Sequence, residues 1–234
     1  MYYPKITARI ENARAAYLTT AFRVEQERQR NTLVEFQIEE PIDTAESAIL
    51  SMGFENELSE KCVLRVLECN QINPHLFECL AVDPSFFIYQ ADYIFQGTRL
   101  TVDEALTKIA TAFGFTFMNL SKKMIYKRHN LNFLSTVRNA LDQIMSIWGL
   151  SDLRYHFDTL RQRLYLLPGK LDTAPFELDM TYFIEENPDN GPEFRVLPNM
   201  SPFTPVIWKG EEMVVDNVVF DGESDSMFLQ LEAA

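Results

Sequence analysis

The chain has 234 residues, of which 47% are hydrophobic and 12% aromatic, enough to fill one large or two smaller cores. It has no run of about 18 apolar residues, and residues 1–7 lack the basic and apolar segments of a signal peptide, so we expect a soluble protein made in a cytoplasm. The odd number of cysteines (Cys62, Cys69 and Cys79) lacks C-x2-C spacing, which favours buried free thiols.

The net charge of −13 lies almost entirely in the last quarter of the chain. Residues 171–234 hold 14 Asp/Glu against only Arg195 and Lys209, a net charge of −12. An acidic excess opposes binding to a phosphate backbone, because affinity for nucleic acid rises with the number of cations that replace condensed counterions. The sequence therefore favours a solvated acidic surface and no specific nucleic-acid binding.

Residues 1–90 alternate between apolar and polar side chains like an antiparallel sheet. Ile6, Ala8 and Ile10 share one face of a first strand, and the next two strands form a hairpin with a polar tip at 28–32. Such short strands with one short helix are typical of a small barrel or sandwich. The expected elements are the hairpin strands 22–24 and 34–38, a helix at 44–53, and strands at 63–67, 76–82 and 86–89.

Residues 101–149 contain the same pattern twice. Thr-Val-x-x-Ala-Leu-x-x-Ile-x-x-x-x-Gly occurs at 101–114 and again at 136–149, a constant shift of 35 residues with six identical positions of fourteen. Each copy predicts an amphipathic helix that ends at a glycine and is followed by a strand, at 115–118 and 155–157. Thr101 with Glu104 forms a capping box, whereas the second copy has Asn139 in place of the glutamate. The pattern indicates one unit used twice, or two helices that share a common local sequence.

A basic cluster follows the first copy: Lys122, Lys123, Lys127 and Arg128, with Tyr126 between them. Basic residues mixed with an aromatic residue are one signal for nucleic acid. A short hairpin edge with exposed lysines is the alternative that we favour, because lysine on an edge strand discourages unwanted strand pairing.

The chain returns to strands from Arg163. The expected strands are 164–167, 194–197, 206–208, 213–220 and 227–231, with a loose acidic region near 185–192. These predict a second antiparallel β module, in whose core we place Trp208 and Phe228, with subunit contacts as the alternative.

The sequence offers no assembled catalytic or metal motif. His75, His129 and His156 are widely spaced, and the acidic run at Asp221, Glu223 and Asp225 lacks the alternating ligands of a calcium loop. Adjacent carboxylates such as Glu39/Glu40 and Glu211/Glu212 point to opposite faces of a strand. We therefore predict no enzyme, no catalytic, cofactor-binding or metal-binding residue, and no cofactor.

Three passages resemble the baseplate hub proteins of contractile phage tails, the late-control D type. YIFQGTRLTVDEAL (93–106) is similar to the family's strand and first helix. NFLSTV (132–137), continuing through 149–150 and 163–166, resembles its second unit. The segments 196–198, 204–208, MVVDNVVFDG (213–222) and MFLQLEA (227–233) resemble its last barrel strands.

The resemblance implies a structural protein of the virion tail baseplate, assembled in the host cytoplasm and not bound to a membrane. It implies a homotrimer whose β modules form a pseudo-sixfold ring, with the tail tube protein, the central spike protein and other baseplate proteins as partners, and DNA passing through the ring. The alternatives are a ring-forming component of a secretion or injection apparatus and a tail-associated hydrolase.

The predicted fold class is α+β, with two small antiparallel β-barrel or sandwich modules flanking a duplicated helix–strand middle region. The expected domains are an N-terminal β-barrel module at 1–95, the duplicated region at 96–162 and an acidic C-terminal β-barrel module at 163–234.

Overall fold

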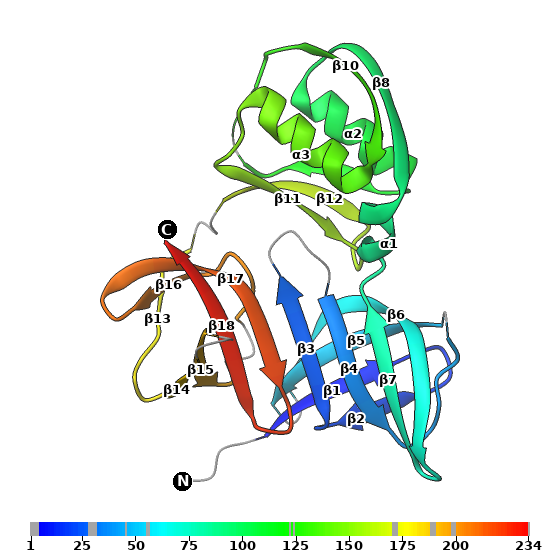
Figure 1. Ribbon diagram of the computed structural model, residues 1–234, viewed down its shortest axis with the longest axis vertical. Helices are drawn as coiled ribbons and strands as arrows, with labels where there is room; N and C mark the ends of the chain where they lie inside the picture. The colour runs from blue at the N-terminus through cyan, green and yellow to red at the C-terminus, as the bar shows by residue number, and fades with distance from the viewer. Residues whose placement is uncertain are drawn as a thin grey trace. The chain divides into compact units, whose positions relative to one another are not determined.

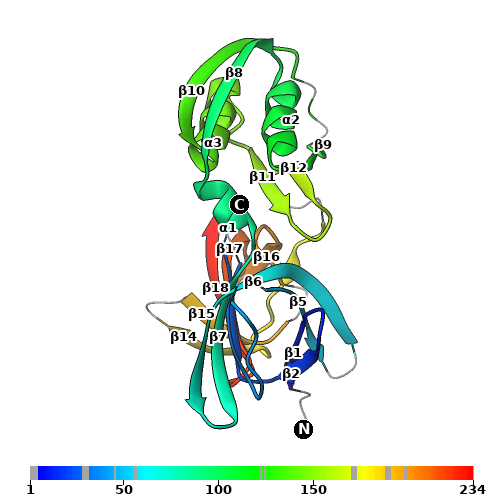
Figure 2. The ribbon, with the colours of Figure 1, turned by 90° about the vertical axis from the view of Figure 1, so that its right-hand side faces the viewer.

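The computed structural model describes residues 5–27, 32–44, 46–54, 57–121, 123, 125–169, 173–187, 191–197 and 200–233. The chain divides into two compact units (Figures 1 and 2). Unit 1 comprises Met1–Asp83 and Thr173–Ala234, and unit 2 is the continuous segment Pro84–Asp172 between them. The boundaries between the units therefore follow residues 83 and 172, whereas the sequence analysis placed domain boundaries at residues 95 and 162. Both β-rich segments belong to unit 1.

Unit 1 is built on one sheet. Its described residues form thirteen strands, which follow the order β14-β15-β18-β17-β3-β4-β7-β6-β5-β1-β2, with β13 and β16 joined to β17 beside this path. The strands are β1 (Ile6–Glu11), β2 (Ala16–Thr19), β3 (Phe22–Glu27), β4 (Thr32–Ile38), β5 (Ser47–Phe54), β6 (Glu57–Asn73), β7 (Leu76–Val82), β13 (Phe176–Glu177), β14 (Phe183–Asn187), β15 (Gly191–Arg195), β16 (Pro205–Trp208), β17 (Glu211–Asp221) and β18 (Ser226–Ala233).

The two β-rich segments meet where β17 pairs with β3 in antiparallel register from Asn217↔Glu27 to Asp221↔Arg23. The turn after β17 strengthens this junction, because the N–H of Gly222 donates to the Phe22 carbonyl at 2.8 Å. A Cβ at Gly222 would lie 2.3 Å from the Phe22 ring and 2.4 Å from the Thr20 carbonyl oxygen, so only glycine fits this close approach. The N–H of Ile6 also donates to Asp225 Oδ1 at 2.9 Å.

The α+β class, with β-rich segments on either side of a duplicated helix–strand region, is confirmed, and among the described residues no sheet closes into a barrel. The predicted hairpin is β3 and β4, in which Val24 pairs with Val34. Its tip at 28–31 lies outside the described residues, whereas the strand predicted at 76–82 is β7.

Two short elements were predicted wrongly. The segment 44–53 was expected to be a helix, but β5 occupies Ser47–Phe54, because Ala48, Leu50 and Met52 alternate into the core with the two-residue period of a strand. The segment 86–89 was expected to be a strand and is instead helix α1 (Ser85–Gln90), which starts directly after Pro84. Proline is favoured where a helix begins, since its φ is already helical and its missing N–H costs no bond there.

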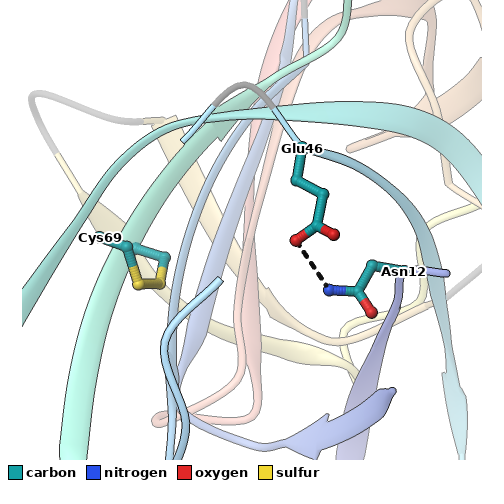
Figure 3. The surroundings of a disulfide bond; sticks show 4 residues. Asn12, Glu46 and Cys69 are labelled. Carbon is teal, nitrogen blue, oxygen red and sulfur yellow. Dashed lines mark hydrogen bonds between the residues drawn. A yellow bond between two sulfur atoms is a disulfide. The ribbon is translucent and has the colours of Figure 1, made fainter. Parts of the chain in front are cut away.

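The prediction of three free thiols was also wrong. Cys69 and Cys79 lie opposite each other on β6 and β7, and their sulfur atoms form a disulfide (Figure 3). Cys62 is a buried free thiol, as predicted, and burial raises its pKa well above the ordinary value. The same view shows Asn12 Nδ2 donating to Glu46 Oε2 at 3.3 Å, which joins the end of β1 to the start of β5. The spacing of ten residues did not reveal that a hairpin brings Cys69 and Cys79 together.

Unit 1 has one core, to which both segments contribute. Its fully buried side chains come from the N-terminal strands and from the C-terminal strands alike, and they form one continuous cluster. Trp208 lies in this core as predicted, at 6% exposure, whereas Phe228 is only half-buried on β18. The β3–β17 junction therefore closes a core that neither segment completes alone.

Unit 2 consists of two strand–helix–strand units. The first is β8-α2-β9 and the second is β10-α3-β11; β8 pairs with β10, whereas β9 and β11 both pair with β12. The described elements besides α1 are β8 (Asp92–Leu100), α2 (Val102–Ala112), β9 (Thr116–Asn119), β10 (His129–Thr136), α3 (Val137–Trp148), β11 (Leu153–Asp158) and β12 (Arg163–Pro168).

The two helices begin at equivalent residues, and each is followed by an equivalent glycine. Thr101 and Thr136 cap their N-termini, and Gly114 and Gly149 follow the last turn with φ of 79° and 67°, in the left-handed region that favours glycine. The strands predicted after each glycine are β9 and β11. The sequence repeat is thus a repeat of local structure, and strand 163–168 belongs to unit 2 instead of the C-terminal β module.

The two repeats share one core. The apolar stripes of α2 and α3 are buried against Tyr155, Phe157 and the inner side chains of β8 and β10. The Tyr155 hydroxyl donates to Asp142 Oδ1 at 2.7 Å, and burial together with this carboxylate raises the pKa of Tyr155. Among the described helices of the chain, none has both the length and the apolar character that a membrane span requires.

We expect the first helix cap to be pH-dependent. Thr101 donates hydrogen bonds to Glu104 from its backbone N–H (2.7 Å) and its hydroxyl, and these bonds lower the pKa of Glu104 from its ordinary 4.5. A carboxyl whose folded pKa is lowered contributes stability above the unfolded pKa and loses it as the pH falls through the folded value. Urea unfolding should therefore show Glu104→Gln to be less stable than the parent at pH 7, with the difference disappearing as the pH falls through the lowered folded pKa of Glu104.

The equivalent position in α3 supplies the control for this cap. Asn139→Glu introduces the missing carboxylate and should stabilise the chain at pH 7 with the same loss on acidification, because Thr136 already caps the Asn139 N–H. Equal stability of Glu104→Gln and the parent at pH 7 would contradict the role of the carboxylate.

We expect unit 2 to fold alone and the N-terminal segment of unit 1 not to. The fragment 84–172 contains both repeats and its complete core, so it should unfold cooperatively in circular dichroism. The fragment 1–83 lacks the β17 partner of β3 and the core residues that the C-terminal strands supply, so it should remain unfolded or aggregate, and mixing it with the fragment 173–234 should restore β-structure. Cooperative unfolding of the fragment 1–83 by itself would contradict the shared core.

Candidate functional site

The structure places the three histidines on separate elements. His75 is exposed in the turn between β6 and β7, and His156 is exposed on β11. His129 begins β10 and packs edge-on against Trp148, with ring centroids 4.9 Å apart. In the part of the chain that the structure describes, no three His, Cys, Asp or Glu side chains group as metal ligands would. The prediction that the chain has no catalytic, cofactor or metal site remains a prediction.

The acidic run after β17 is a hairpin turn. Asp221 Oδ1 accepts the N–H groups of Glu223 (2.9 Å) and Ser224 (3.2 Å), and Asp225 accepts the N–H of Ile6. Asp221 thus holds the backbone of the β17–β18 turn, as expected for a hairpin tip, and Asp225 joins the turn to β1.

The basic cluster belongs to a connection and not to a hairpin edge, which corrects the structure we favoured for it. Lys123 and residues 125–128 lie between β9 and β10 without strand pairing, and Lys122 is outside the described residues. Lys123 pairs with Asp152, while Arg128 Nη1 donates to the Arg99 carbonyl at 2.7 Å and lies 3.5 Å from Glu104 Oε2. Two of the cations are thus used within unit 2.

The segment between β13 and the end of β14 exposes large apolar side chains. Met180 is 63% exposed and Ile184 is 46% exposed, with Tyr182 between them at 39%. We call these three residues the β14 patch. Phe176 on β13 is also exposed. Scattered exposed apolar residues are ordinary, whereas a group within one short segment is a candidate interaction surface.

Local structure explains why these side chains face outward. Phe183 points inward, where its ring lies 5.3 Å from Trp208 and 5.8 Å from Phe194, so Tyr182 and Ile184 point away from the core. Met180 lies in a turn that Asp179 stabilises by accepting the Thr181 N–H at 3.0 Å, which lowers the pKa of Asp179. The patch is therefore fixed by core packing on one side and by a turn on the other.

A groove of about 560 Å³ runs beside the patch. Met180 and Tyr182 line it together with Trp208, and Glu177 and Asp179 add carboxylates. Lys209 Nζ lies 5.2 Å from the centroid of the Trp208 ring and 2.8 Å from Glu186 Oε2. The groove thus has apolar walls and a border of carboxylates. The one lysine among its described lining residues, Lys209, is already paired with Glu186.

Unit 2 carries a second exposed apolar surface, on the ribbon formed by β8 and β10. Phe95 and Phe133 stack on its inner face with ring centroids 5.3 Å apart. Their neighbours Ile94 and Leu134 lie opposite each other in the register and are 66% and 69% exposed. With the exposed amides Gln96 and Asn132, which also pair, they form what we call the ribbon face.

The two units carry opposite charge. Unit 2 contains 11 Lys/Arg and 7 Asp/Glu, a net charge of +4, whereas unit 1 contains 10 Lys/Arg and 27 Asp/Glu, a net charge of −17. The excess of acidic residues in 171–234 was evident from the sequence. The excess of basic residues in unit 2 was not, because its boundaries were unknown. Nor did the sequence single out Met180, Ile184, Ile94 or Leu134, because a single apolar residue looks the same in the sequence whether it is buried or exposed.

No protein-family model and no curated protein matches the chain. Its fold is similar over nearly the full length to three solved tail proteins. A tail protein from Neisseria meningitidis MC58 has a TM-score of 0.73 at 10% identity and covers 97% of this chain and 96% of its own. The 43 kDa tail protein of prophage MuSo2 from Shewanella oneidensis has a TM-score of 0.68 at 9% identity, covering 96% of this chain and 97% of its own.

The third is the prophage tail protein gp18 from Listeria monocytogenes EGD-e, with a TM-score of 0.61 at 11% identity, covering 96% of this chain and 94% of its own. The E. coli c3393 protein, a component of the type VI secretion system, also has a TM-score of 0.61, at 8% identity, and covers 100% of this chain and 75% of its own. The chain thus has the fold of phage tail proteins and of a related secretion-system component, as its resemblance to baseplate hub proteins indicated.

Proposed function

We propose that the chain is a structural component of a phage tail baseplate. The observation that carries this proposal is the likeness of nearly the whole chain to the Neisseria and Shewanella tail proteins, which includes both units and their order. The exposed apolar groups on β14 and on the β8–β10 ribbon are the kind of surface by which subunits bind one another.

The finer proposal is a homotrimer that forms a pseudo-sixfold ring between the tail tube and the central spike. Two features of unit 1 support it. Its described sheet ends at β14 and β2, and an unpaired edge strand is a template for another chain, so assembly would cover these edges. Its two β-rich segments lie side by side around one junction, so three copies would present six such segments around an axis.

An injection or secretion apparatus is the second candidate. The match to the type VI secretion component covers all of this chain, and that protein exhibits structural similarity to the T4 tail proteins gp27 and gp5. A tail-associated hydrolase has no comparable support. Both assembly candidates predict a ring, and they differ in the partner that the ring binds.

We expect the purified chain to form a trimer with three times the 27.1 kDa mass of one chain, and rings in electron micrographs. Light scattering over a range of concentrations measures the mass, and co-expression with candidate tube and spike proteins tests the partners. A monomer that binds none of these proteins and cleaves peptidoglycan would replace the structural role with the hydrolase.

We further propose that the acidic surface of unit 1 keeps DNA from adhering to the ring. Glu211, Glu212 and Glu223 are exposed, and their like charge repels phosphates. Phage assembled with all three changed to lysine should eject DNA more slowly, and the glutamine variant should fall between it and the parent. Unchanged ejection by the lysine variant would show that these acids do not face the DNA.

A further inference from the structure

We infer that the β14 patch of one copy binds the ribbon face of unit 2 of a second copy, head to tail. This inference rests on the proposed ring and names the surfaces that hold it together. The partner is thus another molecule of this chain, and the contact joins unit 1 of one molecule to unit 2 of the next.

The two surfaces match in their apolar content. The β14 patch presents Met180, Tyr182 and Ile184 beside a groove, and the ribbon face presents Ile94 and Leu134 as a cross-strand pair. Methionine and tyrosine suit such a contact, because methionine adapts its shape and tyrosine combines a large apolar ring with a hydroxyl. Each surface costs free energy while it faces water, and burying one against the other removes both costs.

The units that carry the two surfaces are opposite in charge. Around the β14 patch the exposed side chains Glu177, Asp179 and Glu185 are acidic. In unit 2 the exposed cation Arg99 lies near the end of β8, five residues and so about 17 Å from Ile94 at 3.4 Å per residue. Lys127 and Arg128 are exposed in the connection before β10, and Arg128 donates to the Arg99 carbonyl. The net charge is −17 for the whole of unit 1 and +4 for the whole of unit 2. This complementarity selects unit 2 as the occupant, because a second acidic unit 1 would be repelled.

A contact between different surfaces has a geometric consequence. Each copy offers one β14 patch and one ribbon face, so each copy binds two neighbours, and the chain of contacts closes into a ring when the rotation between copies permits. The same contact made within one molecule would yield only monomers. The formation of oligomers therefore distinguishes a contact between two molecules from the same contact within one molecule.

The first experiment removes the apolar groups and measures association by sedimentation equilibrium. Tyr182→Ser with Ile184→Thr alters the patch, and Ile94→Thr with Leu134→Thr alters the ribbon face. Each pair should raise the dissociation constant about ten-fold or more, since each removes two large apolar groups from the contact. Ile72→Thr and Leu120→Thr are the controls, because these residues are also exposed, on strand β6 and directly after strand β9, and lie on neither surface. They should associate like the parent.

The second experiment mixes the two variants. A patch variant and a ribbon variant each retain one intact surface, so together they should form dimers that do not close into rings. A charge exchange adds an independent test: Glu177→Lys with Glu185→Lys should weaken association, and so should Arg99→Glu with Lys127→Glu, while a mixture of the two should associate more tightly than either alone. Circular dichroism confirms that each variant is folded.

The outcomes separate this inference from the proposed function. Rings that form equally well with the patch and ribbon variants would overturn the inference and leave the ring in place. A parent protein that stays monomeric at every concentration would overturn both. Weakened association by the patch and ribbon variants alone, with dimers from their mixture, supports the inference.

Discussion

The pairing of β3 with β17 is the constraint on which the rest of unit 1 depends. It joins strands that are almost 200 residues apart in the chain and merges two β-rich segments into one sheet with one core. Unit 2 is inserted between them and completes its own core separately. Because the pairing fixes the order of the sheet from β14 to β2, it also decides which strands remain at the edges and which side chains face outward there.

The local features of this fold could be predicted from the sequence, and the long-range ones could not. The caps Thr101 and Thr136 and the left-handed glycines Gly114 and Gly149 act within a few residues, so the repeat of helix and strand followed directly from their spacing. The helix expected at 44–53 and the strand expected at 86–89 were wrong because short apolar runs fit either period. Nothing local in the sequence encodes the partner of β3 or the alignment of Cys69 with Cys79.

The candidate assembly surfaces were hidden for a related reason. Tyr182 and Ile184 face outward only because Phe183 packs on Trp208, and Ile94 and Leu134 face outward only because Phe95 stacks on Phe133. In a strand, the choice of which alternate set is buried depends on the neighbouring elements. The distribution of charge was easier to predict, because acidic residues can be counted along the sequence without knowing the fold. The net positive charge of unit 2 could be counted only once the structure had given its boundaries. The chain combines these surfaces with the fold of phage tail proteins.

The distance along the chain between β3 and β17 also sets the order in which the two units of a newly synthesised molecule fold. At roughly 5–20 residues per second, a ribosome needs on the order of 10 to 40 seconds to reach β17 after it has finished β3. Unit 2 leaves the ribosome whole during this interval, while the N-terminal strands wait with a bare edge. Premature release of the nascent polypeptide would leave that edge permanently open, so nearly every truncated product carries a template for misassembly that chaperones and proteases recognise.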